Sequence, residues 1–277
     1  MSPDEYCQRK TAQSGSSFYY SFLFLPPEQR RAITALYAYC RQIDDVVDEC
    51  SDANVASAKL NWWRGEINAL LAGNPTHPVT QALQPHLATY KLDGAHLLAI
   101  IGGMDLDLDQ SRYANFQQLE HYCWHVAGVV GMLSANIFGH TRPETLQYAE
   151  KLGLAFQLTN IIRDVGEDAR KDRIYLPHDE LTQFGVAEAD ILNARHTKNF
   201  EKLMQFQAER AHATYQQAFA LLPKEDRRSQ RPGLMMAAIY RTLLREIERD
   251  GFHVLNQRIA LTPIRKLWLA WKTYVRG

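Results

Sequence analysis

The sequence predicts an all-α protein, and three observations point to this fold class. Apolar residues recur at three- and four-residue steps in segment after segment of the 277-residue chain, as they do on the buried face of a helix. Strand signals are sparse, because no hairpin dipeptide stands between two alternating runs. No low-complexity linker divides the chain, so we expect residues 1–277 to form a single domain.

Four helices are expected in the first half of the chain. The first begins at Pro26 and Pro27, since proline is tolerated in the first turn of a helix. Its apolar stripe consists of Ile33, Leu36, Cys40, Ile43 and Val47. The other three are expected over Ala58–Leu71, which stops at Gly73, and over Val79–Tyr90 and Ala95–Gln110.

The second half continues in the same way. Phe116–Gly139 carries an apolar stripe, and Thr141–Glu144 matches a capping box that opens a helix running to about Asp168. A loop is expected within Asp168–Gly185, with Pro177 as a stop or start signal. Two further helices are expected over Asn199–Leu221 and Leu234–Ile259.

Composition excludes several classes of function. The formal net charge is zero, which gives no indication of nucleic-acid binding. The four cysteines form no metal-binding pattern and are expected to be reduced, as is usual in the cytoplasm. The segment Met1–Ser17 lacks the apolar core of a signal peptide, and no apolar run is long enough to span a bilayer.

The C-terminal segment Leu261–Gly277 combines aromatic and basic residues and leaves two interpretations open. We favour a docked final helix with a solvated basic face, because such helices are common. The alternative is peripheral contact with a membrane, at its inner face for a cytoplasmic protein.

One predicted helix concentrates carboxylates on a single face. Tyr37, Arg41, Asp44 and Asp48 follow one another at steps of three and four residues, with Asp45 beside them. Like charges at this spacing disfavour an isolated helix, so a counterion is expected. Mg²⁺ binds one or two carboxylates together with substrate phosphate oxygens, and therefore suits this face.

A second helix repeats the arrangement about half the chain away. Gln157, Asn160, Asp164 and Asp168 share one face, and Arg163 lies beside them. A helical bundle could bring the two acidic faces together across a cavity. Spacing alone does not select them, because Asp105 and Asp109 are also four residues apart. The third pair has fewer amide, arginine and tyrosine neighbours on its face.

Other routes to phosphate or metal chemistry lack their sequence signatures. The chain contains no glycine-rich phosphate loop, no His-Glu-x-x-His and no Gly-x-Ser-x-Gly. A di-iron carboxylate bundle is disfavoured, because the histidines do not supply Glu-x-x-His on helices.

Three segments resemble one known family. Tyr37–Glu49 is similar to the first aspartate motif of squalene and phytoene synthases, Tyr122–Gly131 to their central helix, and Gln157–Pro177 to their second aspartate motif. The resemblance also takes in Ser14–Leu25 and Ala238–Arg258, and so spans nearly the whole chain in the expected order. It implies the isoprenoid synthase helical bundle with a central cavity.

The implied activity is head-to-head (1′-1) condensation of two prenyl diphosphates. Within the family, Val165–Arg170 looks most like the bacterial presqualene diphosphate synthase of hopanoid pathways. We therefore expect two farnesyl diphosphates as substrates, two or three Mg²⁺ ions, no nucleotide cofactor for this step, and downstream pathway enzymes as partners. The alternatives are a phytoene synthase using geranylgeranyl diphosphate, a squalene synthase with a reductive second step, a class I terpene cyclase, and a non-catalytic assembly protein of the same fold.

The resemblance also assigns roles to individual residues. The metal ligands would be Asp44, Asp48, Asn160, Asp164 and Asp168, and the catalytic residues Tyr37, Arg41, Tyr122, Tyr175 and Tyr240. Substrate would be bound by Ser17, Phe18, Arg41, Val126, Gln157, Asn160, Arg163 and Arg258. One departure concerns the N-terminal phosphate contacts, because the run Gln13–Phe18 lacks the basic residue or histidine that family members often carry there.

Overall fold

The computed structural model describes residues 1–13, 18–50 and 52–276, and within these ranges the fold is all-α, as predicted. The helices, with a π-helical turn η1 and a 3₁₀ turn η2, are α1 (Pro3–Gln13), α2 (Phe18–Phe22), α3 (Pro27–Glu49), α4 (Ala53–Leu71), α5 (Pro78–Thr89), α6 (Gly94–Asp109), α7 (Phe116–Cys123), η1 (Trp124–Gly128), α8 (Val129–Phe138), α9 (Glu144–Ala169), α10 (His178–Phe184), α11 (Glu188–Leu192), α12 (Lys198–Leu221), α13 (Arg231–Arg249), η2 (His253–Leu255) and α14 (Pro263–Arg276).

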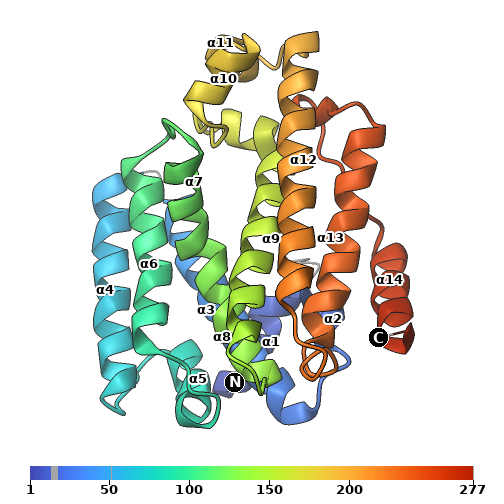
Figure 1. The fold of residues 1–277 in the computed structure, drawn as a ribbon. Helices are drawn as coiled ribbons and strands as arrows, with labels where there is room; N and C mark the ends of the chain where they lie inside the picture. The colour runs from blue at the N-terminus through green and yellow to red at the C-terminus, as the bar shows by residue number, and fades with distance from the viewer. Residues whose placement is uncertain (14–17, 51, 277) are drawn as a thin grey trace.

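The long helices run side by side, with α9 near the middle of the bundle (Figure 1). Helix α9 packs against α12, α8 and α13, whereas α3 packs against α1, α5, α6 and α4. The buried apolar residues accordingly form two clusters. One is built mainly on α9, α12 and α13, and the other on α3, α4, α5, α6 and α8. Phe18 and Val126 lie against both clusters, so they mark where the two halves of the core meet.

Helix α9 approaches α8 and the adjoining turn η1 closely at two glycines. A Cβ atom added to Gly131 would overlap the carbonyl oxygen of Ala149, and one added to Gly153 would overlap the carbonyl oxygen of Ala127. Only glycine allows the two backbones this close approach. Both glycines also line the central cavity, so they contribute both to helix packing and to the cavity wall.

The expected capping box at Thr141–Glu144 is wrong. Helix α9 begins after Pro143, which makes no side-chain cap. The carboxylate of Asp226, from the loop between α12 and α13, instead accepts hydrogen bonds from the backbone N–H groups of Thr141 and Arg142 at 2.8 and 3.0 Å. It also accepts the hydroxyls of Thr141 and Thr145. The start of α9 is thus stabilised by a residue distant in sequence.

Two other helix boundaries differ from expectation. The helix expected over Leu234–Ile259 ends at Arg249, because Gly251 and Phe252 adopt positive φ angles of 70° and 59° and reverse the chain. The helix expected over Phe116–Gly139 contains the π-helical turn η1, a feature that often accompanies functional sites. Pro177 precedes α10, so it is the start signal within the expected loop region.

The C-terminal segment forms the docked helix that was favoured, α14, which packs against α13 and α2. Its outward face, however, is mainly apolar and not basic. Among the described residues, no helix has the length and apolar character needed to cross a membrane.

Candidate active site

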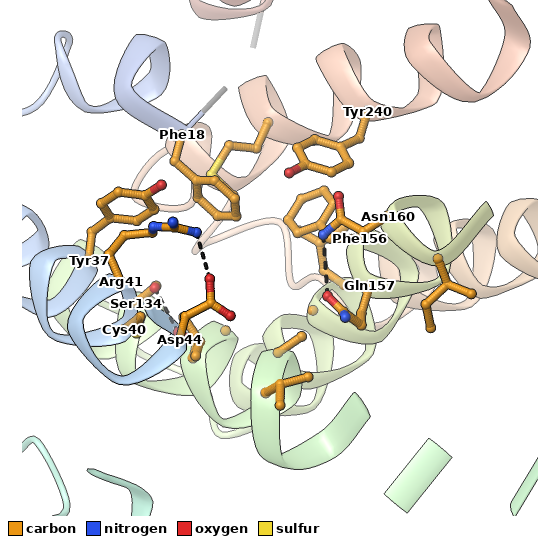
Figure 2. A pocket seen from close by; sticks show the side chains of 18 of the residues that line it. Phe18, Tyr37, Cys40, Arg41, Asp44, Ser134, Phe156, Gln157, Asn160 and Tyr240 are labelled. Atoms are coloured by element: carbon orange, nitrogen blue, oxygen red, sulfur yellow. Dashed lines mark hydrogen bonds and ion pairs between the residues drawn. The ribbon is translucent and has the colours of Figure 1, made fainter. Parts of the chain in front are cut away.

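A cavity of about 740 Å³ lies between the two halves of the core. Its walls come mainly from α3, α6, α8, α9 and α13. One end carries the acidic faces of α3 and α9, and the rest is lined mainly by aromatic and aliphatic side chains, with Ser134 and Gln230 among them. Figure 2 shows Asp44 and Arg41 facing the cavity beside the rings of Phe18 and Tyr37. A cavity of this size, apolar with polar groups gathered at one end, is typical of a small-molecule site.

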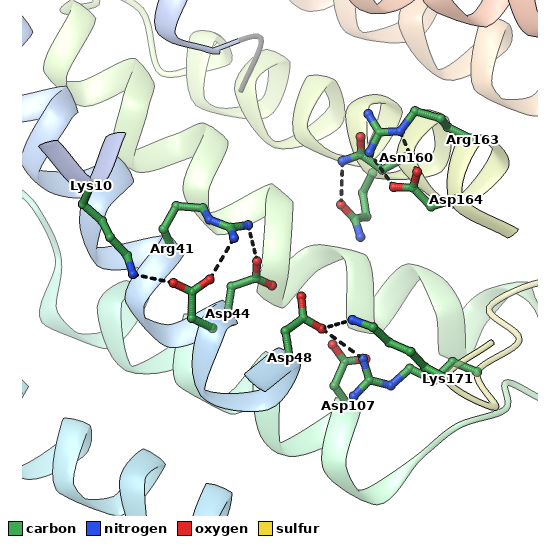
Figure 3. Close-up of polar contacts among 12 residues, drawn as sticks. Lys10, Arg41, Asp44, Asp48, Asp107, Asn160, Arg163, Asp164 and Lys171 are labelled. Carbon is green, nitrogen blue, oxygen red and sulfur yellow. Dashed lines mark hydrogen bonds and ion pairs between the residues drawn. The ribbon is translucent and has the colours of Figure 1, made fainter. Parts of the chain in front are cut away.

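The acidic face of α3 is held by basic neighbours (Figure 3). The Arg41 guanidinium bonds Asp44 at 2.6 Å and Asp45 at 2.8 Å. Lys10 of α1 also contacts Asp45, at 2.6 Å. Asp44 and Asp48 line the cavity, and Asp45 is not among its lining residues. The pair Asp44/Asp48 therefore forms the cavity face of α3, while Asp45 connects α3 to α1.

The acidic face of α9 has a comparable arrangement. Arg163 Nε donates to Asp164 Oδ1 at 2.7 Å, and Arg258 Nε lies 3.3 Å from the same oxygen. Asn160 Nδ2 donates to Gln157 Oε1 at 3.2 Å. The amide oxygen of Asn160 itself, Oδ1, is buried and has no hydrogen-bond partner within the described structure. A buried acceptor of this kind needs a ligand, because leaving it unsatisfied costs free energy.

The loop after α9 returns to the acidic face of α3. Lys171 Nζ lies 2.8 Å from Asp48 Oδ1, and Arg173 lies 3.5 Å from the same atom. Both basic side chains line the cavity. They place positive charge between the two acid pairs, where a diphosphate would meet it.

Asp107 is a cavity residue that the sequence analysis missed. Its carboxylate, buried on α6, accepts the hydroxyl protons of Tyr122 at 2.9 Å and Tyr175 at 2.8 Å. The acid pair that the sequence analysis considered on this helix, Asp105 and Asp109, lies on either side of Asp107. Neither is placed like Asp107, because Asp105 forms an ion pair with Arg64 and Asp109 is exposed. A signal was present, because Asp107 continues the buried stripe of Ile100, Gly103 and Met104 on α6.

Aromatic rings line the cavity beside the acidic end. Phe18 lies between Tyr37, Tyr240 and Phe156, with ring centroids 5.7, 6.0 and 6.2 Å away (Figure 2). Tyr240 and Phe156 are 4.8 Å apart. Aromatic faces attract cations through the ring quadrupole, so this group suits a carbocation that forms next to a departing diphosphate.

The structure brings the predicted site residues together around this one cavity. The lining residues include Phe18, Tyr37, Arg41, Asp44, Asp48, Tyr122, Val126, Gln157, Asn160, Arg163, Asp164, Asp168, Tyr175, Tyr240 and Arg258. Ser17 lies outside the described residues. The roles assigned to these residues stay predictions.

The donor set fits a hard divalent cation that is shared with substrate. The acid pairs and Asn160 Oδ1 supply oxygen ligands, which Mg²⁺ prefers. Within the described ranges, no three acidic, histidine or cysteine side chains gather closely enough to hold an ion by themselves. Diphosphate oxygens and water would therefore complete the coordination, as is usual for Mg²⁺ sites.

Metal binding should weaken at mildly acidic pH. Burial and the nearby Asp164 raise the pKa of Asp168 to about 7, and burial, with Asp48 nearby, raises the pKa of Asp44 to about 6. As the pH falls through these values both carboxyl groups take up a proton, and protons then compete with the metal. We expect the affinity for Mg²⁺ to fall roughly twentyfold between about pH 8 and about pH 6, about tenfold from Asp168 and a further factor of about two from Asp44.

Thermal-shift titration with Mg²⁺ in the absence of substrate checks this expectation, because a ligand that binds the folded state raises Tm with its concentration. The Asp168→Asn variant is the matched control, since it removes the group that titrates near neutrality. Equal Mg²⁺ affinity at both pH values in the unmodified protein would contradict the assignment of Asp44 and Asp168 as ligands.

Comparison with known proteins identifies the family. The sequence profile described as squalene/phytoene synthase matches residues 11–265. A phytoene synthase of Arthrospira platensis is 37% identical over 279 residues, covering 95% of this chain and 89% of the relative. The chain belongs to the squalene/phytoene synthase family, whose members are prenyltransferases, and it is therefore a transferase of that class.

Solved structures agree with this assignment. A dehydrosqualene synthase in complex with ligand superimposes with a TM-score of 0.88 at 28% identity, covering 99% of this chain and 96% of the other. Squalene synthase HpnC from Alicyclobacillus acidocaldarius superimposes with a TM-score of 0.81 at 29% identity, covering 90% and 94%. The predicted isoprenoid synthase bundle is thus confirmed, and divalent metal ions are the cofactors used in this family for binding diphosphate substrates.

Proposed function

We propose that the protein is a Mg²⁺-dependent enzyme that joins two prenyl diphosphates head to head and releases diphosphate. One observation carries this proposal: the acidic faces of α3 and α9 meet at one end of a cavity whose remainder is mainly apolar. A diphosphate requires the charged end, and a hydrocarbon chain requires the apolar walls. We further propose that residues 1–277 act as one domain, located in the cytoplasm, which the free cysteines within the described ranges support.

Each part of the site has a task in this reaction. Mg²⁺, when bound, supplies Lewis-acid chemistry that makes diphosphate a better leaving group; Asp44, Asp48, Asn160, Asp164 and Asp168 would hold it. Arg41, Arg163, Arg258, Lys171 and Arg173 line the charged end and would bind phosphate oxygens. The apolar walls exclude water, which would otherwise quench the allylic cation.

The bond-forming step balances within the two substrates. The C1–O bond of one prenyl diphosphate breaks, and diphosphate leaves with the electron pair. The double bond next to the diphosphate of the second chain attacks the resulting cation. Loss of one proton, which the released diphosphate takes up, then closes a cyclopropane. The rings of Tyr37, Phe18 and Tyr240 lie where they would stabilise the cation. The product of this step retains one diphosphate.

The names of the sequence relatives favour geranylgeranyl diphosphate over the farnesyl diphosphate expected from the motif at Val165–Arg170. The Arthrospira platensis relative, 37% identical, is a phytoene synthase. Lining residues on α9 run from Asp168 to Tyr148, about 30 Å at the rise of an α-helix. An extended geranylgeranyl chain is about 18 Å long if each bond of its main chain advances about as far as a bond of an extended protein backbone. The cavity is therefore long enough for it.

Farnesyl diphosphate is the second candidate, and two observations favour it. The dehydrosqualene synthase and the squalene synthase HpnC are similar to this chain along 99% and 90% of its length. The motif at Val165–Arg170 points the same way. A product of this substrate would be presqualene diphosphate.

Separate incubations with each prenyl diphosphate, with and without NADPH, test the proposal. We expect a Mg²⁺-dependent product whose mass equals that of two substrate molecules after the loss of one diphosphate or of two diphosphates. We also expect kcat/KM to be at least about tenfold higher for one chain length than for the other. A product containing a single prenyl chain would instead indicate a class I cyclase. Absence of any product from both substrates would favour a non-catalytic protein of the same fold.

A further inference from the structure

The outward face of helix α14 is exposed and apolar. Its members are Ile264, Leu267, Trp268, Trp271, Tyr274 and Val275, with exposed fractions of 82, 44, 51, 53, 40 and 61%. They follow one another at steps of one and three residues and so form a single stripe along the helix, an arc of roughly 120°. A surface helix of a globular protein normally exposes polar side chains to solvent.

The opposite face of α14 is already used for docking. Ala270 is fully buried, and Lys266, Leu269 and Thr273 are partly buried. Tyr274, at the edge of the outward face, stacks on Phe24 at 5.0 Å. The helix is therefore anchored to α13 and α2 and lies at the outer side of α13 (Figure 1). The exposure of its apolar stripe shows that this stripe faces away from the bundle.

Positive charge borders this apolar stripe. Lys272 lies along one edge of the outward face, and its Nζ lies 4.6 Å from the ring centroid of Trp268. Arg265, on the same edge, is ion-paired with Glu246 of α13 at 2.6 Å, so Lys272 supplies the positive charge that faces outward there. The sequence Pro263–Arg276 contains no acidic residue. Basic residues beside tryptophan and aliphatic side chains are the pattern of helices that lie in the interface of an anionic membrane.

The same region forms part of the cavity wall. Arg258, Ile259, Ala260 and Leu261, which lead into α14, line the cavity, as does Lys266 of α14 itself. Phe18 lines it from α2, on which α14 rests. A surface bound through α14 would therefore lie beside the cavity.

We propose that the outward face of α14 binds the surface of an anionic lipid bilayer. A second protein copy suits this face less well, because stable protein interfaces use about 20–30 residues a side and the stripe has six. Binding places the cavity beside the lipid phase, which would receive a long hydrocarbon product. This last point rests on the proposed function, whereas the binding itself does not.

Vesicle flotation of the full chain tests the proposal. We expect the protein to float with vesicles of phosphatidylcholine and phosphatidylglycerol, and far less with phosphatidylcholine alone. The double variant Trp268→Gln/Trp271→Gln should bind the mixed vesicles at least about tenfold more weakly, because it removes the two largest apolar side chains. Lys272→Gln should weaken binding about fivefold, the effect of one basic residue near such a surface.

Trp62→Gln is the matched control, since Trp62 is 51% exposed but lies on α4. It should float like the unmodified protein, and all variants should keep the helical far-UV spectrum. The proposal is overturned if the unmodified protein does not float, or if the double variant floats as well as Trp62→Gln. A concentration-dependent dimer that the double variant abolishes, without vesicle binding, would assign the face to a second copy and overturn it too. Because flotation uses no substrate, an inactive protein that floats would refute the proposed function alone.

Discussion

Replacing Asp48 or Asp164 with alanine is expected to lower turnover at least about a thousandfold while the helical fold persists. The two residues belong to opposite acidic faces that line the same end of the cavity. Each removal takes an oxygen ligand from the metals that neutralise diphosphate, an effect of several kcal/mol on the barrier. Folding should not suffer, because each substitution also relieves repulsion between like charges on one helix.

The matched control for this experiment is Asp109→Ala. Asp109 stands in an Asp-x-x-x-Asp pair of identical spacing but is exposed on α6 and lies outside the cavity. Its substitution should leave diphosphate release unchanged. Normal diphosphate release by both the Asp48 and Asp164 variants, with far-UV spectra unaltered, would exclude the two faces as the metal site.

Replacing Asp107 should produce the second large effect. In Asp107→Ala, the buried hydroxyl of Tyr122 and the partly buried hydroxyl of Tyr175 lose their acceptor, which is expected to cost about 2–4 kcal/mol of folding stability. Asp107→Asn keeps the shape and one acceptor oxygen, so it should fold with a Tm near that of the unmodified protein. Its kcat should still fall about a hundredfold with little change in KM, because Tyr122 and Tyr175 are no longer both held in place.

Tyrosine variants separate positioning from packing. Tyr175→Phe should lower kcat, and its combination with Asp107→Asn should be less severe than the product of the single effects, because both act through one hydrogen bond. Tyr113→Phe is the control: Tyr113 stacks on Tyr175 at 5.7 Å, and its hydroxyl has no partner in the described structure. If Asp107→Asn retains full turnover, Asp107 has no positioning role.

Local sequence patterns predicted much of this fold, since helical periodicity reports on the immediate chain. The stripe from Ile33 to Val47 predicted α3, and steps of three and four residues placed Asp44 with Asp48 and Asp164 with Asp168 on cavity faces. These features depend on the rotation per residue of a single helix. Asp107 could have been found in the same way. The buried residues of α6 lead to it, whereas the four-residue spacing of Asp105 and Asp109 leads away from it.

What the sequence did not predict depends on contacts between distant segments. Asp226 accepts hydrogen bonds at the start of α9 although it is more than eighty residues away in the sequence. Lys171, which follows α9, forms an ion pair with Asp48 of α3. No local pattern encodes either contact. The basic outward face expected for α14 was wrong for a related reason: amphipathicity gives a helix two faces, but the packing against α13 and α2 decides which one is covered.

A crossover experiment with isotopically labelled substrate tests the central claim most directly. Equal amounts of unlabelled and fully deuterated prenyl diphosphate are incubated with the protein and Mg²⁺, using the chain length that gives product. Coupling of two chains predicts products of three masses: light, heavy and a mixed species in between. A product that appears only in the light and heavy forms would show that each molecule derives from one chain, and would contradict the account.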